Sequence, residues 1–413
     1  MQETPVFFSN ETGKPQYKIN LQELLHCMGD SGQAGLIRIE GFENPAIKNY
    51  FPGDIFKTAS EKFHEILLNL KKRGILRKED MITFHTEKYN NAIIFLSKKR
   101  DTNYYLMHEM DVLLYRLYDT FFTELAQDYR THLPWHDSFT VSGSFLLLDA
   151  KQELGEFIAK SIHDANENLF YHQKKYSLRK QEIINHVILH QEIEPRYLKV
   201  IDLKTSSTML NFSFASFKST IPWMKNSWTA FLIASEEGFD IELDDAAHHI
   251  ILKDYMEHNT TPIVLFFTSP WSQNQTQRTH FLNKLEILWS TYPQKKMLSL
   301  PMAHKSELEG LINDLSIHSI FTDIILSLDL FTINYDIEST YLPEVKGIEI
   351  KRDLFLTAVQ NQSTRAILEK VISIAIQNDC NVIINGIENK EELEIAKNLG
   401  ATLATGFYLQ GLD

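Results

Sequence analysis

Apolar positions recur at strand and helix spacing along the first 170 residues. Alternating or continuous apolar runs of four to nine residues are typical of strands, and apolar side chains every three or four positions are typical of amphipathic helices. The patterns fall in the order strand 36–39, helix 56–70, strand 92–96, helix 110–117, strand 140–148 and helix 154–169. Strands flanked by several helices predict one α/β domain.

The second half of the chain has a different rhythm, in which short β runs alternate with helices. The β runs fit residues 199–203, 263–267, 297–300, 324–328, 347–350, 382–384 and 401–407. Repeated βα units over about 230 residues predict a parallel TIM-type barrel, with an open doubly wound sheet as the alternative. In such a barrel the chemistry lies at the carboxyl ends of the strands.

A polar, basic and aromatic passage at residues 171–176 predicts a connector between the two halves. We therefore expect three segments. They are a short helical N-terminal segment over residues 1–33, an α/β domain over residues 34–176 and a barrel domain over residues 177–413. A cap formed by Asn389 and Glu392 is expected to begin one of the barrel helices.

The charge of the chain restricts its partners. The 413 residues include 54 Asp and Glu against 41 Lys and Arg, which gives a formal net charge of −13. Proteins that neutralise nucleic-acid phosphates usually carry a dominant basic stripe, and this chain has none. The short run Lys71-Lys72-Arg73 before Gly74 is interpreted as the last turn of a helix, with a phosphate or membrane patch as the alternative.

Targeting signals are not apparent in the sequence. No apolar run approaches about 18–20 residues, so we expect no membrane span. The first residues resemble no signal peptide, and Cys27 and Cys380 fit a reducing compartment without a disulfide. These features predict a cytoplasmic protein.

Common catalytic motifs are missing as well, including phosphate-binding glycine loops, Cys-x-x-Cys and His-Glu-x-x-His. Asp244, Asp245, His248 and His249 could share one helical turn, as metal ligands sometimes do. A solvated helix face is the favoured interpretation of that group. We therefore expect neither a metal nor a cofactor.

The order of elements from about residue 34 to the end resembles a tandem GGDEF–EAL protein of bacterial cyclic di-GMP signalling. In the first domain, residues 36–42 resemble the opening strand, and residues 140–142 and 164–170 resemble the late strand and the last helix. The signature turn corresponds to His85, Thr86, Glu87, Lys88 and Tyr89. Both glycines of that turn are replaced, and Arg38 stands where the family has a metal-binding Asp. The resemblance thus implies a nucleotide-cyclase-like fold without diguanylate cyclase activity.

In the barrel, residues 197–205, 328–331, 384–388 and 400–407 resemble successive motifs of the EAL domain. The Glu-Ala-Leu triplet falls on Phe212-Ser213-Phe214. The positions that correspond to the functional side chains of the family are occupied here by Phe212, Ser216, Phe266, Ser299, Asp329, Leu330, Glu349, Lys351, Asn385, Glu388 and Thr405. The resemblance implies an arginine at the position of Ser216, a Glu at Ser299 and a Gln at Thr405. It implies a Lys at the position of Glu349 and an Asp at that of Lys351. Phe and Leu offer no oxygen to a hard cation, so the resemblance implies that the metal-dependent phosphodiesterase site is lost.

Three functions are compatible with this resemblance. The favoured one is a non-catalytic regulatory protein that acts through protein contacts in motility, biofilm or envelope traits, and the family adds the expectation of a homodimer. The second is a cyclic di-GMP receptor that binds without hydrolysis. It is not favoured, because no phosphate-facing cation is evident and Phe212, Phe214 and Phe266 are expected to fill the barrel mouth. The third is an enzyme of altered specificity that uses Asp329, Glu349 and Glu388.

Overall fold

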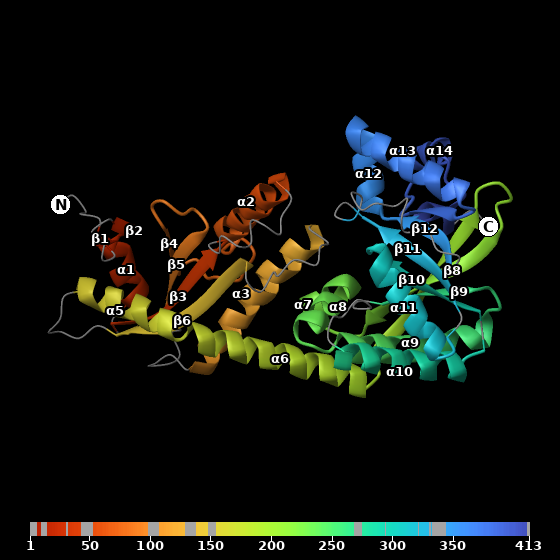
Figure 1. Ribbon diagram of the computed structural model, residues 1–413. Coiled ribbons are helices and arrows are strands. Elements are labelled where there is room, and N and C mark those ends of the chain that lie inside the picture. The colour runs from red at the N-terminus through yellow and green to blue at the C-terminus, as the bar shows by residue number, and fades with distance from the viewer. Residues whose placement is uncertain are drawn as a thin grey trace. The chain divides into compact units, whose positions relative to one another are not determined.

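The computed structural model consists of two compact units, which are coloured along the chain in Figure 1. It describes residues 6–9, 15–29, 32–42, 53–97, 107–128, 138–147, 154–267, 275–293, 295–320, 322–329, 332 and 344–410. One unit comprises Met1–Ile183 and Thr220–Glu237, and the other comprises Ile184–Ser219 and Gly238–Asp413. The expected segments 1–33, 34–176 and 177–413 stay a prediction about which parts fold independently.

The first unit is built on a four-stranded antiparallel sheet in the order β4-β5-β3-β6. Its strands are β3 (Gln33–Gly41), β4 (Met81–Phe84), β5 (Asn91–Leu96) and β6 (Phe139–Leu147). Its helices are α2 (Gly53–Asn69), α3 (Met107–Asp128), α5 (Leu154–Glu167) and α6 (Leu169–Leu189), the last of which continues into the second unit. The predicted α/β domain is confirmed. The connector predicted at residues 171–176 lies inside α6, and the two units divide within the same helix, between Ile183 and Ile184.

The N-terminal segment contains more than the predicted helix. Helix α1 (Leu21–Met28) is present, but a hairpin of β1 (Val6–Ser9) and β2 (Pro15–Ile19) precedes it, which the expectation of a purely helical segment missed. Tyr17, Ile19 and Leu24 are buried in one hydrophobic cluster with residues of the sheet and of α5. The segment is therefore part of the core of this unit.

Strand β6 forms one edge of the sheet, and side chains cover its outer backbone groups. The Tyr118 hydroxyl accepts a hydrogen bond from the Val141 amide at 3.2 Å and lies 3.3 Å from its carbonyl oxygen. Asn168 donates to the Gly143 carbonyl at 3.0 Å, and Ser161 donates to the carbonyl of Phe145 at 3.2 Å. His172 contacts the Gly143 carbonyl as well, at 3.3 Å. These bonds satisfy groups that an unprotected edge strand leaves open.

Two short helices that follow β8 in sequence, α7 (Pro222–Lys225) and α8 (Ser227–Glu236), belong to the first unit. Lys180 on α6 forms an ion pair with Glu237 directly after α8, and Gln181 donates to the same carboxylate at 3.1 Å. One residue earlier on α6, Arg179 pairs with Asp119 of α3 at 3.1 Å. These largely buried contacts attach the α7–α8 segment to α6.

The second unit is a closed barrel in the order β7-β8-β9-β10-β11-β12-β13-β14. Its strands are β7 (Ile193–Asp202), β8 (Thr208–Phe217), β9 (Ile263–Phe266), β10 (Lys296–Pro301), β11 (Asp323–Leu328), β12 (Val345–Ile350), β13 (Asn381–Asn385) and β14 (Leu403–Thr405). The predicted TIM-type barrel is confirmed, and the open sheet is wrong. Strand β7 is antiparallel to both neighbours, whereas the remaining pairs are parallel.

Helices connect the parallel strands of the barrel. They are α9 (Asp240–His258), α10 (Gln275–Thr291), α11 (Lys305–Ile317), α12 (Arg352–Gln360), α13 (Gln362–Gln377), α14 (Lys390–Asn398) and the final turn α15 (Phe407–Gln410). The predicted cap is present, because the Asn389 side chain accepts from the Glu392 amide at 2.9 Å. Among the helices of the described residues, none is both long enough and apolar enough to span a membrane.

A glycine directly after β14 allows the chain to pass close to the loop that follows β13. Gly406 has a φ of +153°, and a Cβ at this position would lie 2.2 Å from the backbone nitrogen and carbonyl oxygen of Ile387. Backbone atoms at that distance cannot move aside as a flexible side chain can. The chain therefore needs glycine where β14 passes the loop after β13.

We predict opposite effects for two Gly→Ala substitutions in the barrel. Gly406→Ala should lower the midpoint of thermal unfolding by several degrees, because the overlap costs about 1–3 kcal/mol or more. Gly310→Ala, inside α11 and 3.5 Å from a flexible Arg278 side chain, should raise it, since Ala is favoured over Gly in helices by about 1 kcal/mol. Calorimetry of both variants checks the pair, and an unchanged midpoint for Gly406→Ala would contradict the close approach.

Candidate functional site

The interior face of the barrel carries the predicted site residues at its carboxyl end. Val264, Met297, Ile383 and Leu403 belong to the apolar cluster inside the barrel. Side chains two positions apart on a strand share a face, so the residue two positions further along each strand lies on the interior above that cluster. These residues are Phe266, Ser299, Asn385 and Thr405, and the same reasoning adds Phe212 and Phe214 on β8 and Ser327 on β11.

Glu349 on β12 is at the centre of the polar part of this face. Its side chain is 0% exposed, and three neighbours bind its carboxylate. Ser327 donates to Oε2, Asn385 donates to Oε1 at 2.6 Å, and the Lys351 ammonium lies 3.0 Å from Oε1. Burying an unpaired carboxylate costs several kcal/mol, and these contacts remove that cost by supplying a positive charge and two donors. We call Glu349, Ser327, Lys351 and Asn385 the carboxylate cluster.

Aromatic rings form the other side of the barrel mouth. Phe214 stacks on Phe266 with ring centroids 5.1 Å apart and planes 20° apart, and Phe212 meets Phe266 edge-on at 5.2 Å. The Lys351 ammonium lies 5.0 Å from the centroid of the Phe266 ring, within the range of a cation–π contact. Lys351 thus joins the aromatic rings to the carboxylate cluster.

Two hydroxyl groups on the same interior face have no hydrogen-bond partner among the described residues. They belong to Ser299 on β10 and Thr405 on β14, and both side chains are buried. They occupy two positions at which the sequence comparison expected a carboxylate and an amide.

Asp329 lies just beyond β11 and stabilises a turn. Its carboxylate accepts from the backbone amide and the hydroxyl of Thr332, both at 3.0 Å. Burial raises the pKa of Asp353 at the start of α12, and the negative charge of Asp329 adds to that rise. Leu330, the neighbour of Asp329, lies outside the described residues.

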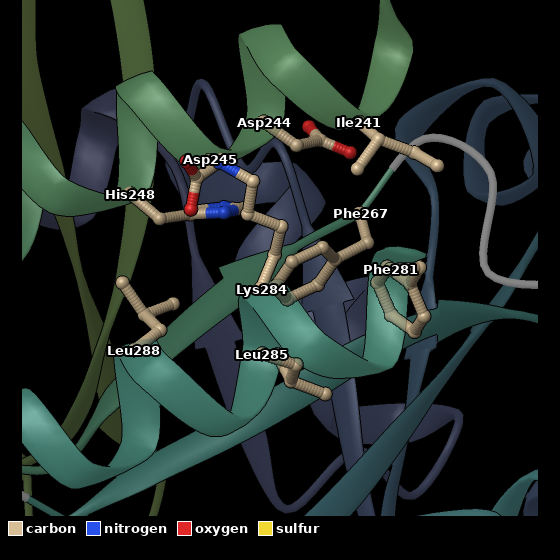
Figure 2. Close-up of a pocket in the computed structure, with 9 residues that line it drawn as sticks. All are labelled: Ile241, Asp244, Asp245, His248, Phe267, Phe281, Lys284, Leu285 and Leu288. Carbon is tan, nitrogen blue, oxygen red and sulfur yellow. Dashed lines mark hydrogen bonds and ion pairs between the residues drawn. The ribbon is translucent and has the colours of Figure 1, made fainter. Parts of the chain in front are cut away.

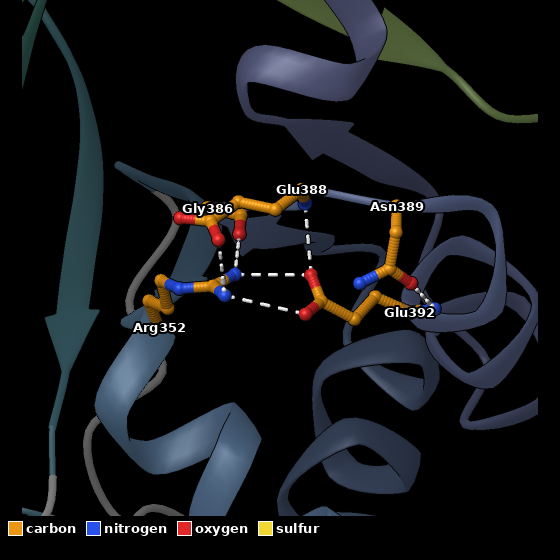
Figure 3. Close-up of polar contacts among 5 residues, drawn as sticks. All are labelled: Arg352, Gly386, Glu388, Asn389 and Glu392. Atoms are coloured by element: carbon orange, nitrogen blue, oxygen red, sulfur yellow. Dashed lines mark hydrogen bonds and ion pairs between the residues drawn. The ribbon is translucent and has the colours of Figure 1, made fainter.

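Glu388 belongs to a separate ion-pair cluster (Figure 3). Arg352 at the start of α12 lies 2.9 Å from Glu388 and makes two bonds to Glu392, at 3.0 and 3.2 Å. It also donates to the carbonyl of Gly386, whose φ is +86° and whose Cβ would meet the Arg352 side chain at 2.8 Å. Glu388 is therefore ion-paired with Arg352, whereas Glu349 belongs to the carboxylate cluster. The two acids lie in different clusters.

Ser216 lies at the rim of the mouth, at the end of β8. Its hydroxyl donates to the Glu194 carbonyl at 3.2 Å and accepts from Arg196 Nε at 3.3 Å. Arg196 is on β7 and pairs with Phe214, whose ring stacks on Phe266. A guanidinium therefore stands beside the position at which the family resemblance expected an arginine. The sequence alone does not indicate this guanidinium, because it comes from the neighbouring antiparallel strand.

In the first unit, the predicted turn His85 to Tyr89 connects β4 and β5. The imidazole Nδ1 of His85 lies 3.1 and 3.2 Å from the backbone nitrogens of Glu87 and Lys88, which donate to it. Tyr89 bonds to Ser60 through its hydroxyl at 2.7 Å. The amides of Glu87 and Lys88 thus form their hydrogen bonds within the turn itself. Arg38 on β3 forms an ion pair with Glu40 two residues further on.

The Asp244–His249 group lies on α9, where it faces α10 (Figure 2). Asp245 binds Lys284 at 2.8 Å and lies 3.4 Å from His249, whereas His248 is buried against the Phe267 ring. Burial lowers the pKa of His248 to about 3, and the neighbouring His249 adds to the decrease. Within the described part of the chain, no three His, Cys, Asp or Glu side chains are grouped as a metal site requires. The expected solvated face is wrong for Asp244 and His248, which are both buried.

Comparison with known proteins identifies the barrel. The model of the EAL domain matches residues 181–411. The chain belongs to the EAL domain family. No curated protein matches the chain.

Several solved structures resemble this EAL protein. One is the S helix–GGDEF–EAL part of Vibrio cholerae LapD bound to c-di-GMP, which is 10% identical, with a TM-score of 0.48 over 94% of this chain and 92% of that one. A second is the FimX EAL domain of Pseudomonas aeruginosa bound to c-di-GMP, which is 17% identical, with a TM-score of 0.44 over 56% and 95%. A third is the PaMucR phosphodiesterase in complex with c-di-GMP, which is 11% identical, with a TM-score of 0.45 over 56% and 96%.

We predict that Glu349 and Lys351 are energetically coupled. Lys351→Met should lower the free energy of unfolding by about 1–3 kcal/mol, because it leaves a buried carboxylate without its cation. Adding Glu349→Gln should restore part of that loss, since the amide is neutral and fills the same space. Urea unfolding of the two single variants and the double variant measures the coupling. Additive effects would show that the pair contributes nothing as a pair.

His248 should make the protein sensitive to acid. The unfolded chain takes up a proton near pH 6.5, whereas the folded chain resists protonation down to about pH 3. Stability from this group is complete above pH 6.5 and is lost as the pH falls, by about 1.4 kcal/mol per unit within that window. His248→Leu should therefore show a shallower fall in unfolding free energy between pH 6 and pH 4 than the wild type. Parallel slopes would mean that His248 is protonated in the folded state.

Proposed function

We propose that this EAL protein is a non-catalytic regulator that acts through protein contacts and lacks both cyclase and phosphodiesterase activity. The observation that carries the proposal is the enclosed carboxylate cluster. Glu349 is fully buried, and Ser327, Lys351 and Asn385 bind its oxygens. Two-metal hydrolysis requires carboxylates that face the ions, whereas an ammonium 3.0 Å from the carboxylate takes the place of a metal charge.

The aromatic side of the mouth supports the same proposal. Phe212, Phe214 and Phe266 occupy strand-end positions where the family resemblance implies metal ligands or their neighbours, and their rings pack on one another. Aromatic rings offer no oxygen to a hard cation. Ser299 and Thr405 add neutral hydroxyl groups. The residues of the mouth therefore do not fit the metal ions that the family chemistry uses.

We interpret the first unit as a degenerate GGDEF-like domain, and two of its features support the proposed loss of cyclase activity. A cyclase turn needs glycines so that the backbone can approach a phosphate. Here, His85 accepts the amides of Glu87 and Lys88. Arg38, at the position of a metal-binding acid, pairs with Glu40. Neither arrangement leaves a place for a nucleotide with its cation.

One observation favours a second candidate, a cyclic di-GMP receptor that binds without hydrolysis. Arg196 at the rim is beside Ser216, and its side chain is 66% exposed. A guanidinium is well suited to bind phosphate, and the stacked rings of Phe214 and Phe266 could hold a base. Arg196 also pairs with Glu194 at 3.1 Å, so a phosphate would have to displace that carboxylate. An enzyme of altered specificity is less well supported, because Glu349 and Glu388 lie in different clusters.

Turnover assays test the proposal directly. The purified full chain should form no product from GTP or from cyclic di-GMP with Mg²⁺ or Mn²⁺, while an active EAL phosphodiesterase run in parallel does. Product formation that is abolished by Asp329→Asn would overturn it.

Calorimetric titration with cyclic di-GMP separates the two candidates. A regulator without nucleotide binding should give no saturable heat. If micromolar binding appears, Arg196→Ala should weaken it and Lys218→Ala should not. Lys218 is the matched control, because it is equally exposed and pairs with the same Glu194, at 3.7 Å.

A further inference from the structure

Basic side chains gather around one turn of the first unit. Lys71 and Lys72 follow the end of α2, Arg77 and Lys78 precede β4, and Arg116 lies on α3. Lys71 donates to the Lys78 carbonyl at 3.0 Å, and Arg116 donates to the Gly74 carbonyl at 3.2 Å. These bonds bring the three segments together at one place. We call the five residues the basic turn.

The basic turn is exposed and carries an excess of positive charge. All five side chains are exposed, and within the described ranges none of them forms an ion pair with a carboxylate. The neighbouring Arg73 does pair, with Glu124 of α3. The chain has 54 acidic residues for 41 Lys and Arg, so carboxylates are plentiful elsewhere. Within the turn, Glu79 and Asp80 follow Lys78, and Asp80 accepts from the Arg77 amide at 2.7 Å. The five cations therefore outnumber these two carboxylates, an excess that is unexpected in so acidic a protein.

The helix dipole explains only part of this group. A cation is favoured near the carboxyl end of a helix, and the effect fades beyond the last turn. Helix α2 ends at Asn69, so Lys71, Lys72 and Arg73 lie beyond its last turn, and the interpretation of this run as that turn is wrong. Gly74 follows with a φ of +68°. Arg77, Lys78 and Arg116 belong to other elements and gain nothing from that dipole. A further cause is needed for the cluster as a whole.

Exposed apolar side chains flank the basic turn. Leu68 is 57% exposed and lies about one helical turn before Lys71 and Lys72 on α2. Val112 is 42% exposed and lies one turn before Arg116 on α3. The surface thus combines positive charge with aliphatic contacts, as a surface for an acidic and partly apolar peptide would.

We propose that the basic turn docks an acidic segment of a partner protein that also carries apolar side chains. Carboxylates of that segment would bind the five cations, and its apolar residues would cover Leu68 and Val112. A net charge of −13 repels extended polyanions such as anionic membranes and nucleic acid at long range. A short acidic segment interacts within a few ångströms, where the local cations dominate. The inference rests on the proposed function, since it names the chemistry of the partner.

Fluorescence anisotropy with a defined probe tests the docking. The probe is a labelled 16-residue peptide of Glu and Leu in a ratio of three to one, at 150 mM salt. We expect saturable binding that weakens as the salt concentration rises. The combined variant Lys72→Ala, Arg77→Ala, Lys78→Ala and Arg116→Ala should weaken binding at least tenfold.

A matched variant controls for the overall charge. Lys57, Lys305, Arg365 and Lys397 are exposed cations that each pair with a Glu three or four residues away. Replacing these four by Ala removes the same charge and should leave peptide binding within twofold of wild type. Equal losses in both variants, or no binding by the wild type, would overturn the proposal.

Two further probes identify the class of partner. Vesicles that contain phosphatidylserine and a 20-base-pair DNA duplex should bind more weakly than the peptide, and tighter binding of either one would overturn the assignment to a protein. Both variants should keep the wild-type result in the turnover assays. Failure at the basic turn is thereby distinguishable from failure of the proposed regulatory function.

Discussion

The buried charge of Glu349 is the constraint around which the barrel mouth is organised. A carboxylate that is 0% exposed must find its counter-charge and its donors within reach of one strand end. Lys351 directly follows β12, two residues after Glu349, while Ser327 and Asn385 come from the strands on either side. The Glu349 side chain thus favours one register of three adjacent strands. A shift of either neighbouring strand by one residue would move Ser327 or Asn385 away from the carboxylate.

The polarity of this pair has a chemical consequence. In the family resemblance, a Lys corresponds to Glu349 and an Asp corresponds to Lys351, so the two charges appear in exchanged order. The ion pair persists, but its cation now points to the aromatic side of the mouth, 5.0 Å from Phe266. Where the resemblance implies a carboxylate, the chain presents the Lys351 ammonium group, 3.0 Å from Glu349. On the proposed function, loss of catalysis and retention of a stable barrel are two results of the same exchange.

Much of the fold could be predicted from periodicity, whereas the site could be predicted only in part. Seven of the barrel strands follow from short β runs; β8 was missed, although its alternating Asn211-Phe212-Ser213-Phe214 pattern is itself a strand signal. Motif order indicated which residues line the mouth. It could not show that Arg196 reaches Ser216, since antiparallel pairing of β7 with β8 decides that contact. It also could not separate Glu388 from Glu349, because both lie near strand ends and only the position of Arg352 distinguishes them.

The covered edge of β6 limits how the first unit can associate with other chains. Tyr118, Asn168 and Ser161 occupy the main-chain groups that a visiting strand would need. A strand that adds to a sheet edge binds mainly through backbone hydrogen bonds, so many sequences can add there. Fibrils grow by the same kind of strand addition. With that route closed at β6, recognition along this edge depends on side chains and so can be selective. The same three residues thus turn an edge that would accept any strand into a surface that must be matched in shape and charge.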